Sequence, residues 1–381
     1  MEKTPQRKEM FTGFRVLELA SVLAGPSVGQ FFAELGAEVI KIENQKTGGD
    51  VTRSWKSAGE MTDDRSAYFC CCNWGKKSVA LDLTLKSDLE VVKKLSKSAD
   101  LLIASYKPGD AEKLGVSYEQ LKKNNEKLIY AQISGYGQDD DRVGYDAVIQ
   151  AESGFMELNG EKDGAPTKMP VALIDVLAAH HLKEGILLAL LNRERTGEGN
   201  LVEVSLLQAA IASLSNQATN WLVGKKLPSR QGSLHPNIAP YGESFVTKDG
   251  KRVLLAVGSD KQFEMLCEFL NIELNKNLFS KNESRVRNRK ELAILLSEKI
   301  SKARADEFLH QCHQRKIPAG LIQNMKEVFE SAQAKEMLLQ SLDLVGTRTF
   351  VSMPSTFEKR QLSPPPHLGE HTREVISLFE D

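Results

Sequence analysis

One acidic residue stands at the start of a long apolar stretch of the chain. The sequence PVALIDVLAAHHLKEGILLALL runs from Pro170 to Leu191, and Asp175 marks the point where an apolar strand pattern gives way to an apolar helix pattern. A carboxylate in this place can cap the helix by accepting a hydrogen bond from an unpaired backbone N–H group, or it can act as a nucleophile. Caps are common and nucleophiles are rare, so the spacing alone favours the cap.

Several motifs that define other chemistries are absent from the sequence. The segment GKKS at Gly75 is not a phosphate-binding P-loop, because Cys70 stands where the upstream glycine belongs. SGYGQDD has Asp140 in place of the last glycine of a dinucleotide-binding motif. His180 and His181 are adjacent and point to different faces of the predicted helix, and there is neither an HExxH nor a GxSxG motif. These absences favour an activity without metal and without nicotinamide.

Length and composition predict a folded protein of about two domains. The chain has 381 residues, 41% of them hydrophobic, and its formal net charge is −1 at pH 7. This balance gives no indication of a nucleic acid or an anionic membrane as partner. The polar N-terminus lacks the apolar core of a signal peptide, and the longest apolar run is too short to span a bilayer. We therefore expect a cytoplasmic protein, with its five cysteines reduced and mostly buried.

Strand and helix patterns alternate over the first two hundred residues. Strands are predicted at 14–20, 38–43, 78–83, 100–106, 127–137 and 171–175. Helical stretches lie between several of them, which predicts a parallel, doubly wound sheet of the α/β class.

The composition of the sequence changes after residue 224. A segment rich in turn-forming residues leads to a hairpin pattern, GESFVTKDGKRVLLAVG, with Asp249 and Gly250 at its tip. We therefore divide the chain into a large domain (1–224), a small domain (225–330) and a C-terminal segment (331–381).

Eight features follow one another along the chain: ASVLAGPSVGQFFAELGAEVIKIE, GGDVTRSW, YKPGDAEKLGVSYEQL, ISGYGQ, GYDAVIQAESGFMELNG, Asp175 in its turn, HPNIAPYG and PPPHLGEHT. Together and in this order they resemble the class III CoA-transferases, which include formyl-CoA transferase and glutarate-specific enzymes. The resemblance implies a Rossmann-like large domain that the C-terminal segment completes, a smaller α+β domain, and an interlocked homodimer.

The resemblance also changes the interpretation of Asp175, whose position matches the family's nucleophilic aspartate. It implies that Asp175 attacks an acyl-CoA to give a mixed anhydride, that the released CoA thiolate returns to give an aspartyl-CoA thioester, and that an acceptor carboxylate reverses the sequence. The chemistry needs no general base, since an unperturbed carboxylate is ionised at pH 7. Cap and nucleophile can be the same residue, because the positive end of the helix dipole favours the ionised carboxylate.

The resemblance implies a binding site for CoA but no permanently bound cofactor, since the CoA thioester is a co-substrate. The partners are then an acyl-CoA and a small carboxylic acid. By resemblance the CoA contacts are Val22, Leu23, Ala24, Leu81, Asp82, Leu83, Ser105, Tyr106, Lys107, Lys113, Gly135 and Tyr136. Lys107 and Lys113 are the stronger candidates, because the phosphates of CoA need cations.

The chain departs from the formyl-CoA branch at several places. Asn44 stands where that branch has an arginine, and Ser105 where the family often has an asparagine. The four-glycine loop of formyl-CoA transferase has no counterpart, and the texture is closer to the glutarate branch. Gly232, His235 and Asn237 are candidates for contacts to the acceptor acid, although ordinary loop capping is the more common reason for such residues.

Two alternatives differ in the kind of function. An α-methylacyl-CoA racemase would share the fold, but Tyr145 stands where that branch has a histidine, and a phenol is a poor base at neutral pH. A non-catalytic CoA-binding protein is the second alternative. Retention of Asp175 argues against it.

Overall fold

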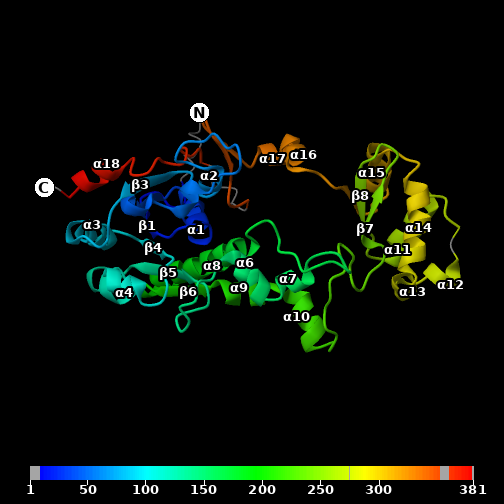
Figure 1. Cartoon of the computed structure of the whole chain (residues 1–381), viewed down its shortest axis with the longest axis horizontal. Helices are drawn as coiled ribbons and strands as arrows, with labels where there is room; N and C mark the ends of the chain where they lie inside the picture. Colours follow the sequence, from blue (N-terminus) through cyan, green and yellow to red (C-terminus); the bar gives the residue numbers. More distant parts are fainter. Residues whose placement is uncertain (1–8, 274, 352–359, 380–381) are drawn as a thin grey trace, which may run out of the picture. The chain divides into compact units, whose positions relative to one another are not determined.

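The computed structural model describes residues 9–273, 275–351 and 360–379 (Figure 1). Strands and helices alternate over the first two hundred residues, in agreement with the predicted pattern. Among the residues described, no helix is both long enough and apolar enough to cross a membrane.

The chain folds into two compact units. The first contains the chain up to residue 156, residues 168–226 and the chain from residue 336 onward, and the second contains 157–167 and 227–335. The segment 157–167, which the sequence division assigned to the large domain, thus groups with the second unit.

Six parallel strands form the central sheet of the first unit. They are β1 (Arg15–Leu19), β2 (Glu38–Glu43), β3 (Lys76–Ala80), β4 (Leu101–Ala104), β5 (Ile129–Ser134) and β6 (Leu201–Ser205). Their order is β3-β2-β1-β4-β5-β6, and every neighbouring pair is parallel. The predicted α/β class is confirmed. The strand order reverses between β1 and β4, and sheets of this kind bind ligands beyond the carboxyl ends of the strands at the point of reversal.

Helices cover both faces of this sheet, because successive strand residues point to opposite sides. Val16 of β1 packs into one core with α1 (Ala24–Glu34), α8 (Leu173–Thr196), α9 (Leu206–Ser213) and α6 (Asp146–Glu152). Its neighbour Leu17 packs into a second core with α3 (Lys86–Lys97), α4 (Asp110–Leu114), α5 (Tyr118–Leu121) and α18 (Thr372–Ser377). The remaining helices of this part of the chain are α2 (Ala67–Cys70), α7 (Phe155–Leu158) and α10 (Ser215–Leu222).

One predicted strand is wrong. Residues 171–175 form no strand, since the helix α8 begins at Leu173 and Asp175 is its third residue. A short apolar run cannot be told from the first turn of a buried helix by its pattern alone. The strand that pairs with β5 is instead β6, whose residues alternate in exposure and which the sequence analysis did not identify.

The second unit is built around an antiparallel sheet. Its strands are β7 (Tyr241–Val246), β8 (Arg252–Ala256) and β9 (Ala319–Leu321). Its helices are α11 (Asp260–Phe269), α12 (Lys276–Phe279), α13 (Asn282–Arg287), α14 (Arg289–Ile300), α15 (Ala305–Gln314), α16 (Met325–Glu330) and α17 (Ala332–Lys335). β7 and β8 form the predicted hairpin, in which Gly250 has a φ of 76° at the turn.

The last part of the chain returns to the first unit. It contains the hairpin of β10 (Leu338–Gln340) and β11 (Val345–Thr347), where the Thr347 carbonyl accepts a hydrogen bond from Gln30 of α1 at 3.1 Å. Near the end of the chain, the His371 N–H donates to the Ser78 carbonyl of β3 at 2.9 Å. Figure 1 shows α18 lying beside β3.

Candidate active site

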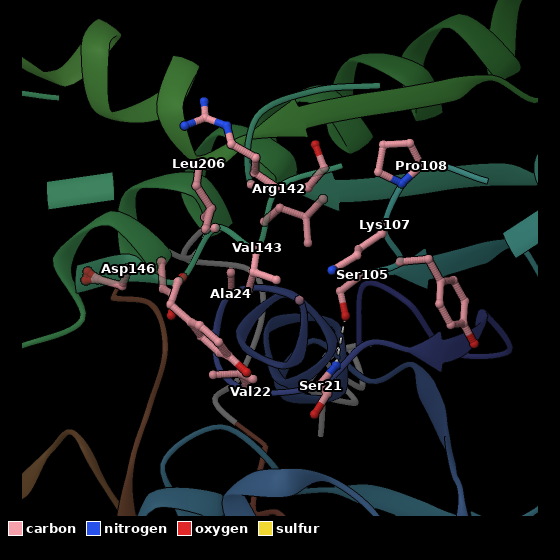
Figure 2. Close-up of a pocket in the computed structure, with 18 of the residues that line it drawn as sticks. Ser21, Val22, Ala24, Ser105, Lys107, Pro108, Arg142, Val143, Asp146 and Leu206 are labelled. Atoms are coloured by element: carbon pink, nitrogen blue, oxygen red, sulfur yellow. Dashed lines mark hydrogen bonds between the residues drawn. The ribbon is translucent and has the colours of Figure 1, made fainter. Parts of the chain in front are cut away.

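A cavity of about 300 Å³ lies where the order of the sheet reverses (Figure 2). Ser21 and Val22 line it directly after β1, and Ser105 and Lys107 line it after β4. In Figure 2 the side chains of Ser21, Ser105 and Lys107 lie on one side of the cavity, and those of Asp146 and Leu206 lie on the other. The cavity therefore occupies the position at which doubly wound sheets bind their ligands.

Asp175 lines this cavity and is 7% exposed. It is not the helix cap, because the N-cap position of α8 is Ala172, which makes no side-chain hydrogen bond. Within the described part of the chain, no hydrogen bond or ion pair engages the Asp175 carboxylate. Both of its oxygens are thus free to react with a molecule in the cavity.

A second acidic residue, Asp146, faces Asp175. Both carboxylate oxygens of Asp146 accept hydrogen bonds from the Gln150 side chain at 2.9 Å. The backbone N–H of Ile174 also donates to Asp146, which ties this carboxyl group to the first turn of α8. The two carboxyl groups line the same cavity and repel each other when both are ionised.

The electrostatic environment of Asp175 differs from the one assumed from the sequence. Burial, and then repulsion by Asp146, raise the pKa of Asp175 to about 7. Removal from water opposes ionisation more strongly than the positive end of the α8 dipole favours it. At neutral pH the carboxylate is consequently only partly ionised, and its ionised form is poorly solvated.

The segment that carries Asp146 is held against the sheet by two glycines. A Cβ atom on Gly135 would lie 2.8 Å from the Cα atom of Gly144, so the two backbones pack in contact. This contact brings the residues after Gly144 back over the carboxyl end of β5. Tyr145 follows as the N-cap of α6, and Asp146 is the first residue of that helix.

Val22 forms part of the cavity wall in a strained conformation. Its φ is 74°, a region that residues with branched side chains rarely adopt. Its N–H group donates to Asp50 Oδ1 at 3.3 Å, and the same oxygen accepts the N–H and the hydroxyl of Thr52. Asp50 therefore fixes the backbone at this edge of the cavity.

Asp50 belongs to a buried cluster of charges beneath the cavity. Lys41 Nζ lies 2.9 Å from Asp50 and 2.9 Å from Glu18, and Lys76 Nζ lies 2.8 Å from Glu18. These four residues are each less than 7% exposed. Burial alone would raise the pKa of Asp50, but the adjacent Lys41 ammonium holds it well below its usual range. The strained Val22 backbone is thus hydrogen-bonded to a member of a buried network of ion pairs.

Most of the predicted CoA contacts line one of two cavities that share a residue. Val22, Ala24, Ser105, Tyr106, Lys107 and Gly135 line the cavity that contains Asp175. Leu81, Asp82, Leu83 and again Tyr106 line a smaller cavity of about 150 Å³. Asn44, which replaces an arginine of the formyl-CoA branch, also lines the smaller cavity. Tyr106 is common to both.

Three of the predicted contacts line neither cavity. Leu23 is the N-cap of α1, between two residues that do line the larger cavity. Lys113 is an exposed residue of α4, and its Nζ atom pairs with Asp110 at 3.0 Å. Tyr136 packs against the Arg142 guanidinium, with 3.9 Å between the guanidinium carbon and the ring centroid.

The sequence analysis missed several residues of the larger cavity. The most important are Asp146, which acts on the pKa of Asp175, and Arg142, which pairs with Asp140 at 2.9 Å and with Glu152 at 3.2 Å. The remaining ones are Ser21, Gly25, Val51, Pro108, Ile133, Ser134, Asp140, Val143, Gly144, Tyr145 and Leu206. Asp146 lies inside the quoted segment GYDAVIQAESG, so its position one residue after a helix cap could have singled it out.

The candidates for the acceptor side lie in the second unit. Gly232 has a φ of 60°. Asn237 donates its N–H to His235 Nδ1 at 3.2 Å, and the His235 ring packs against Tyr241 with 5.0 Å between the ring centroids. These local contacts give the loop its shape.

Among the described residues, one group has the spacing of metal ligands: Asp63, Asp64 and His367. Both carboxylates already face a cation, because Arg65 pairs with Asp63 at 2.5 Å and Arg53 with Asp64 at 3.3 Å. The group joins the C-terminal segment to the first unit and does not line the cavity of Asp175.

Comparisons with known proteins agree on one family. A family model described as CoA-transferase family III matches residues 11–372. A succinate–glutarate CoA-transferase from Agrobacterium fabrum is 37% identical over all of this chain and 98% of its own length. The human succinyl-CoA:glutarate CoA-transferase is 34% identical over 96% of this chain and 84% of its own length. The crystal structure of a CaiB/BaiF family protein from Brucella suis matches with a TM-score of 0.86 and 36% identity, over 97% of this chain and 99% of that one.

Proposed function

This chain belongs to CoA-transferase family III, and from that premise we propose that it moves CoA from succinyl-CoA to glutarate or a similar small dicarboxylate through a covalent intermediate on Asp175. The relative at 37% identity is named a succinate–glutarate CoA-transferase, and the one at 34% identity is named a succinyl-CoA:glutarate CoA-transferase. The observation that carries the assignment to Asp175 is its carboxylate, which lines the cavity and is free of hydrogen bonds to the described residues.

The proposed reaction balances without an external energy source. An oxygen of the Asp175 carboxylate attacks the thioester carbonyl, the C–S bond breaks, and a mixed anhydride and CoA thiolate result. The thiolate then attacks the aspartyl carbonyl, which releases succinate and leaves an aspartyl-CoA thioester. Glutarate attacks this thioester, which expels CoA thiolate and gives a second mixed anhydride. The thiolate then attacks the glutaryl carbonyl, which gives glutaryl-CoA and releases the Asp175 carboxylate. One thioester replaces another, and Asp175 is regenerated.

The environment of Asp175 suits this chemistry. Because the carboxylate is withdrawn from water and accepts no hydrogen bond from the described residues, little solvation has to be removed before it attacks. A raised pKa also makes the carboxylate a stronger base and a better nucleophile once it is ionised. Asp175 and its cavity therefore combine reactivity with access.

We infer that CoA spans the two cavities that share Tyr106. The smaller cavity has the apolar residues Leu81, Leu83 and Leu114, which suit the flat adenine ring. The larger cavity contains Lys107 next to Ser105, which offers a cation and a hydroxyl near the path between adenine and thioester. The pantetheine arm would then reach Asp175.

The function is tested by mass spectrometry of CoA thioesters. The protein is incubated with succinyl-CoA and a mixture of glutarate, other dicarboxylates, formate, oxalate and carnitine. We expect glutaryl-CoA, or the thioester of a similar dicarboxylate, to form. A product from oxalate or formate alone would contradict the proposed substrate. Deuterium uptake at the α-carbon of an acyl-CoA without any new thioester would indicate a racemase instead.

The pH dependence of the reaction should follow the ionisation of Asp175. Since the protonated acid cannot attack and its pKa is raised to about 7, we expect kcat/KM to fall about tenfold for each pH unit below 6. In Asp146→Asn the repelling charge is gone, so the pKa of Asp175 falls and the decrease in kcat/KM begins at a lower pH. Rates of thioester exchange between pH 5 and 8 measure both. If kcat/KM falls at the same pH in Asp146→Asn as in the unchanged protein, Asp146 does not raise the pKa of Asp175.

We further infer that the protein is a homodimer, as the family resemblance implies. Leu188 and Leu191 of α8 and Trp221, Leu222 and Val223 at the end of α10 are between 49% and 78% exposed. Exposed apolar side chains of this size are typical of surfaces that another chain covers. We expect sedimentation velocity to give the mass of two chains at micromolar concentration. An active species with the mass of one chain would contradict the inference.

A further inference from the structure

The first unit contains another cavity, of about 520 Å³, which shares no lining residue with the cavity of Asp175. Phe31 of α1 and Lys183 and Leu187 of α8 line it. Arg348 and Phe350, which follow β11, close it from the C-terminal part of the chain. We call it the α1–α8 cavity.

Lys183 is the unusual residue of the α1–α8 cavity. It is only 6% exposed, and within the described part of the chain its ammonium group has no hydrogen bond and no ion pair. Its Nζ atom lies 5.2 Å from the centroid of the Phe31 ring. Burial lowers the pKa of Lys183 to about 8, although the Glu34 carboxylate opposes this effect. A buried ammonium without a partner is costly, and a bound anion would remove that cost.

The other buried charges around the cavity do not balance Lys183. Glu34 is fully buried, accepts the Thr349 N–H at 2.7 Å and the Thr349 hydroxyl at 2.9 Å, and pairs with Arg348 at 3.5 Å. Arg348 Nε is buried and has no hydrogen-bond partner among the described residues. The carboxylate of Glu184 is 70% exposed, so water screens it. The cavity is left with one buried positive charge in excess.

Apart from His180, Glu184 and Thr349, the rest of the lining is apolar. Phe31, Leu187, Met337, Phe350 and Val351 offer aromatic and aliphatic surface around the two cationic groups. A volume of about 520 Å³ is in the usual range for sites that hold a small organic molecule. An occupant that matches both the charge and the walls has one negative group and an apolar body.

We propose that the α1–α8 cavity is a second binding site, which takes a monocarboxylate with an apolar chain and pairs its carboxylate with Lys183. The site is separate from the transferase reaction and does not depend on the proposed substrates. Its occupant lies between α1 and α8, the two helices whose first turns line the cavity of Asp175.

The test is isothermal titration calorimetry of the full chain with octanoate. We expect saturable binding to the unchanged protein and to Asp175→Asn, and an affinity at least about tenfold lower for Lys183→Met, which keeps the length of the side chain and removes its charge. Lys183→Arg, which keeps the charge, should retain most of the affinity. Octan-1-ol has the same chain without the charge, so it should bind the unchanged protein at least about tenfold more weakly than octanoate.

Three results would overturn the proposal. One is the absence of saturable octanoate binding to the unchanged protein. Another is equal affinity for octanoate and octan-1-ol, which needs no variant and therefore does not depend on the folding of Lys183→Met. The third is binding that disappears in Asp175→Asn but persists in Lys183→Met, because octanoate would then occupy the cavity of Asp175.

Discussion

Replacement of Asp175 by asparagine should lower the rate of CoA transfer by at least about 10⁴-fold, because an amide is too weak a nucleophile to form the anhydride. The substitution keeps the size of the side chain and leaves the cavity lining in place. Initial rates of glutaryl-CoA formation from succinyl-CoA measure the effect. A loss of less than tenfold would show that Asp175 is not the nucleophile.

The stability of Asp175→Asn shows whether a loss of activity is caused by the missing nucleophile or by incomplete folding. The pKa of Asp175 is raised from 3.8 to about 7 in the folded protein, so the folded state holds a proton that the unfolded chain releases between these two values. The stability of the unchanged protein therefore falls as pH rises from about 4 to 7. Asp175→Asn has no such proton to lose. Its free energy of unfolding at pH 8 should therefore exceed that of the unchanged protein by up to about 4 kcal/mol. Thermal unfolding at pH 5 and pH 8 tests this difference.

The second large effect concerns the buried charges beneath the cavity. We expect Lys76→Met to lower the free energy of unfolding by about 3–5 kcal/mol, since Glu18 would lose a buried ionic partner. Lys76 Nζ also donates to the Pro26 carbonyl at 2.8 Å and to Asn73 Oδ1 at 2.9 Å, and both acceptors would lose their donor. Urea unfolding followed by circular dichroism measures the change.

The matched control for this variant is the next residue of the same strand. Lys77 points to the other side of β3 and pairs with Glu38 at 2.9 Å and Glu374 at 2.8 Å, but its side chain is 32% exposed. Exposed pairs contribute little, so Lys77→Met should cost less than about 1 kcal/mol. If the two variants lose the same free energy of unfolding, burial does not determine how much these ion pairs stabilise the protein.

The sequence predicted the elements whose pattern is local. The strand at 38–43 was predicted with the bounds that β2 has, and the turn at Asp249 and Gly250 joins β7 to β8 as expected. These features depend on side-chain alternation and on turn-forming residues, which a short window of sequence contains. The strand predicted at 171–175 was wrong because a run of four apolar residues before Asp175 also fits the first turn of a buried helix.

The properties of the candidate site depend on residues that are far apart in the sequence. The nucleophilic role of Asp175 was predicted from the family resemblance, but its raised pKa depends on burial and on Asp146, which is 29 residues earlier in the chain. The strained conformation of Val22 is held by a hydrogen bond that its N–H donates to Asp50, which no local pattern indicates. No sequence pattern singles out Lys183, which is buried by the packing of α1 and the C-terminal segment.

The covalent intermediate on Asp175 is the central claim, and mass spectrometry of the intact protein tests it most directly. After brief incubation with succinyl-CoA and no acceptor, we expect a species heavier than the free protein by the mass of CoA less one water, as an aspartyl-CoA thioester requires. The added mass should map to the peptide that contains Asp175, disappear on addition of glutarate, and be absent from Asp175→Asn. Rapid turnover by the unchanged protein without this species, or the same added mass in Asp175→Asn, would contradict the mechanism.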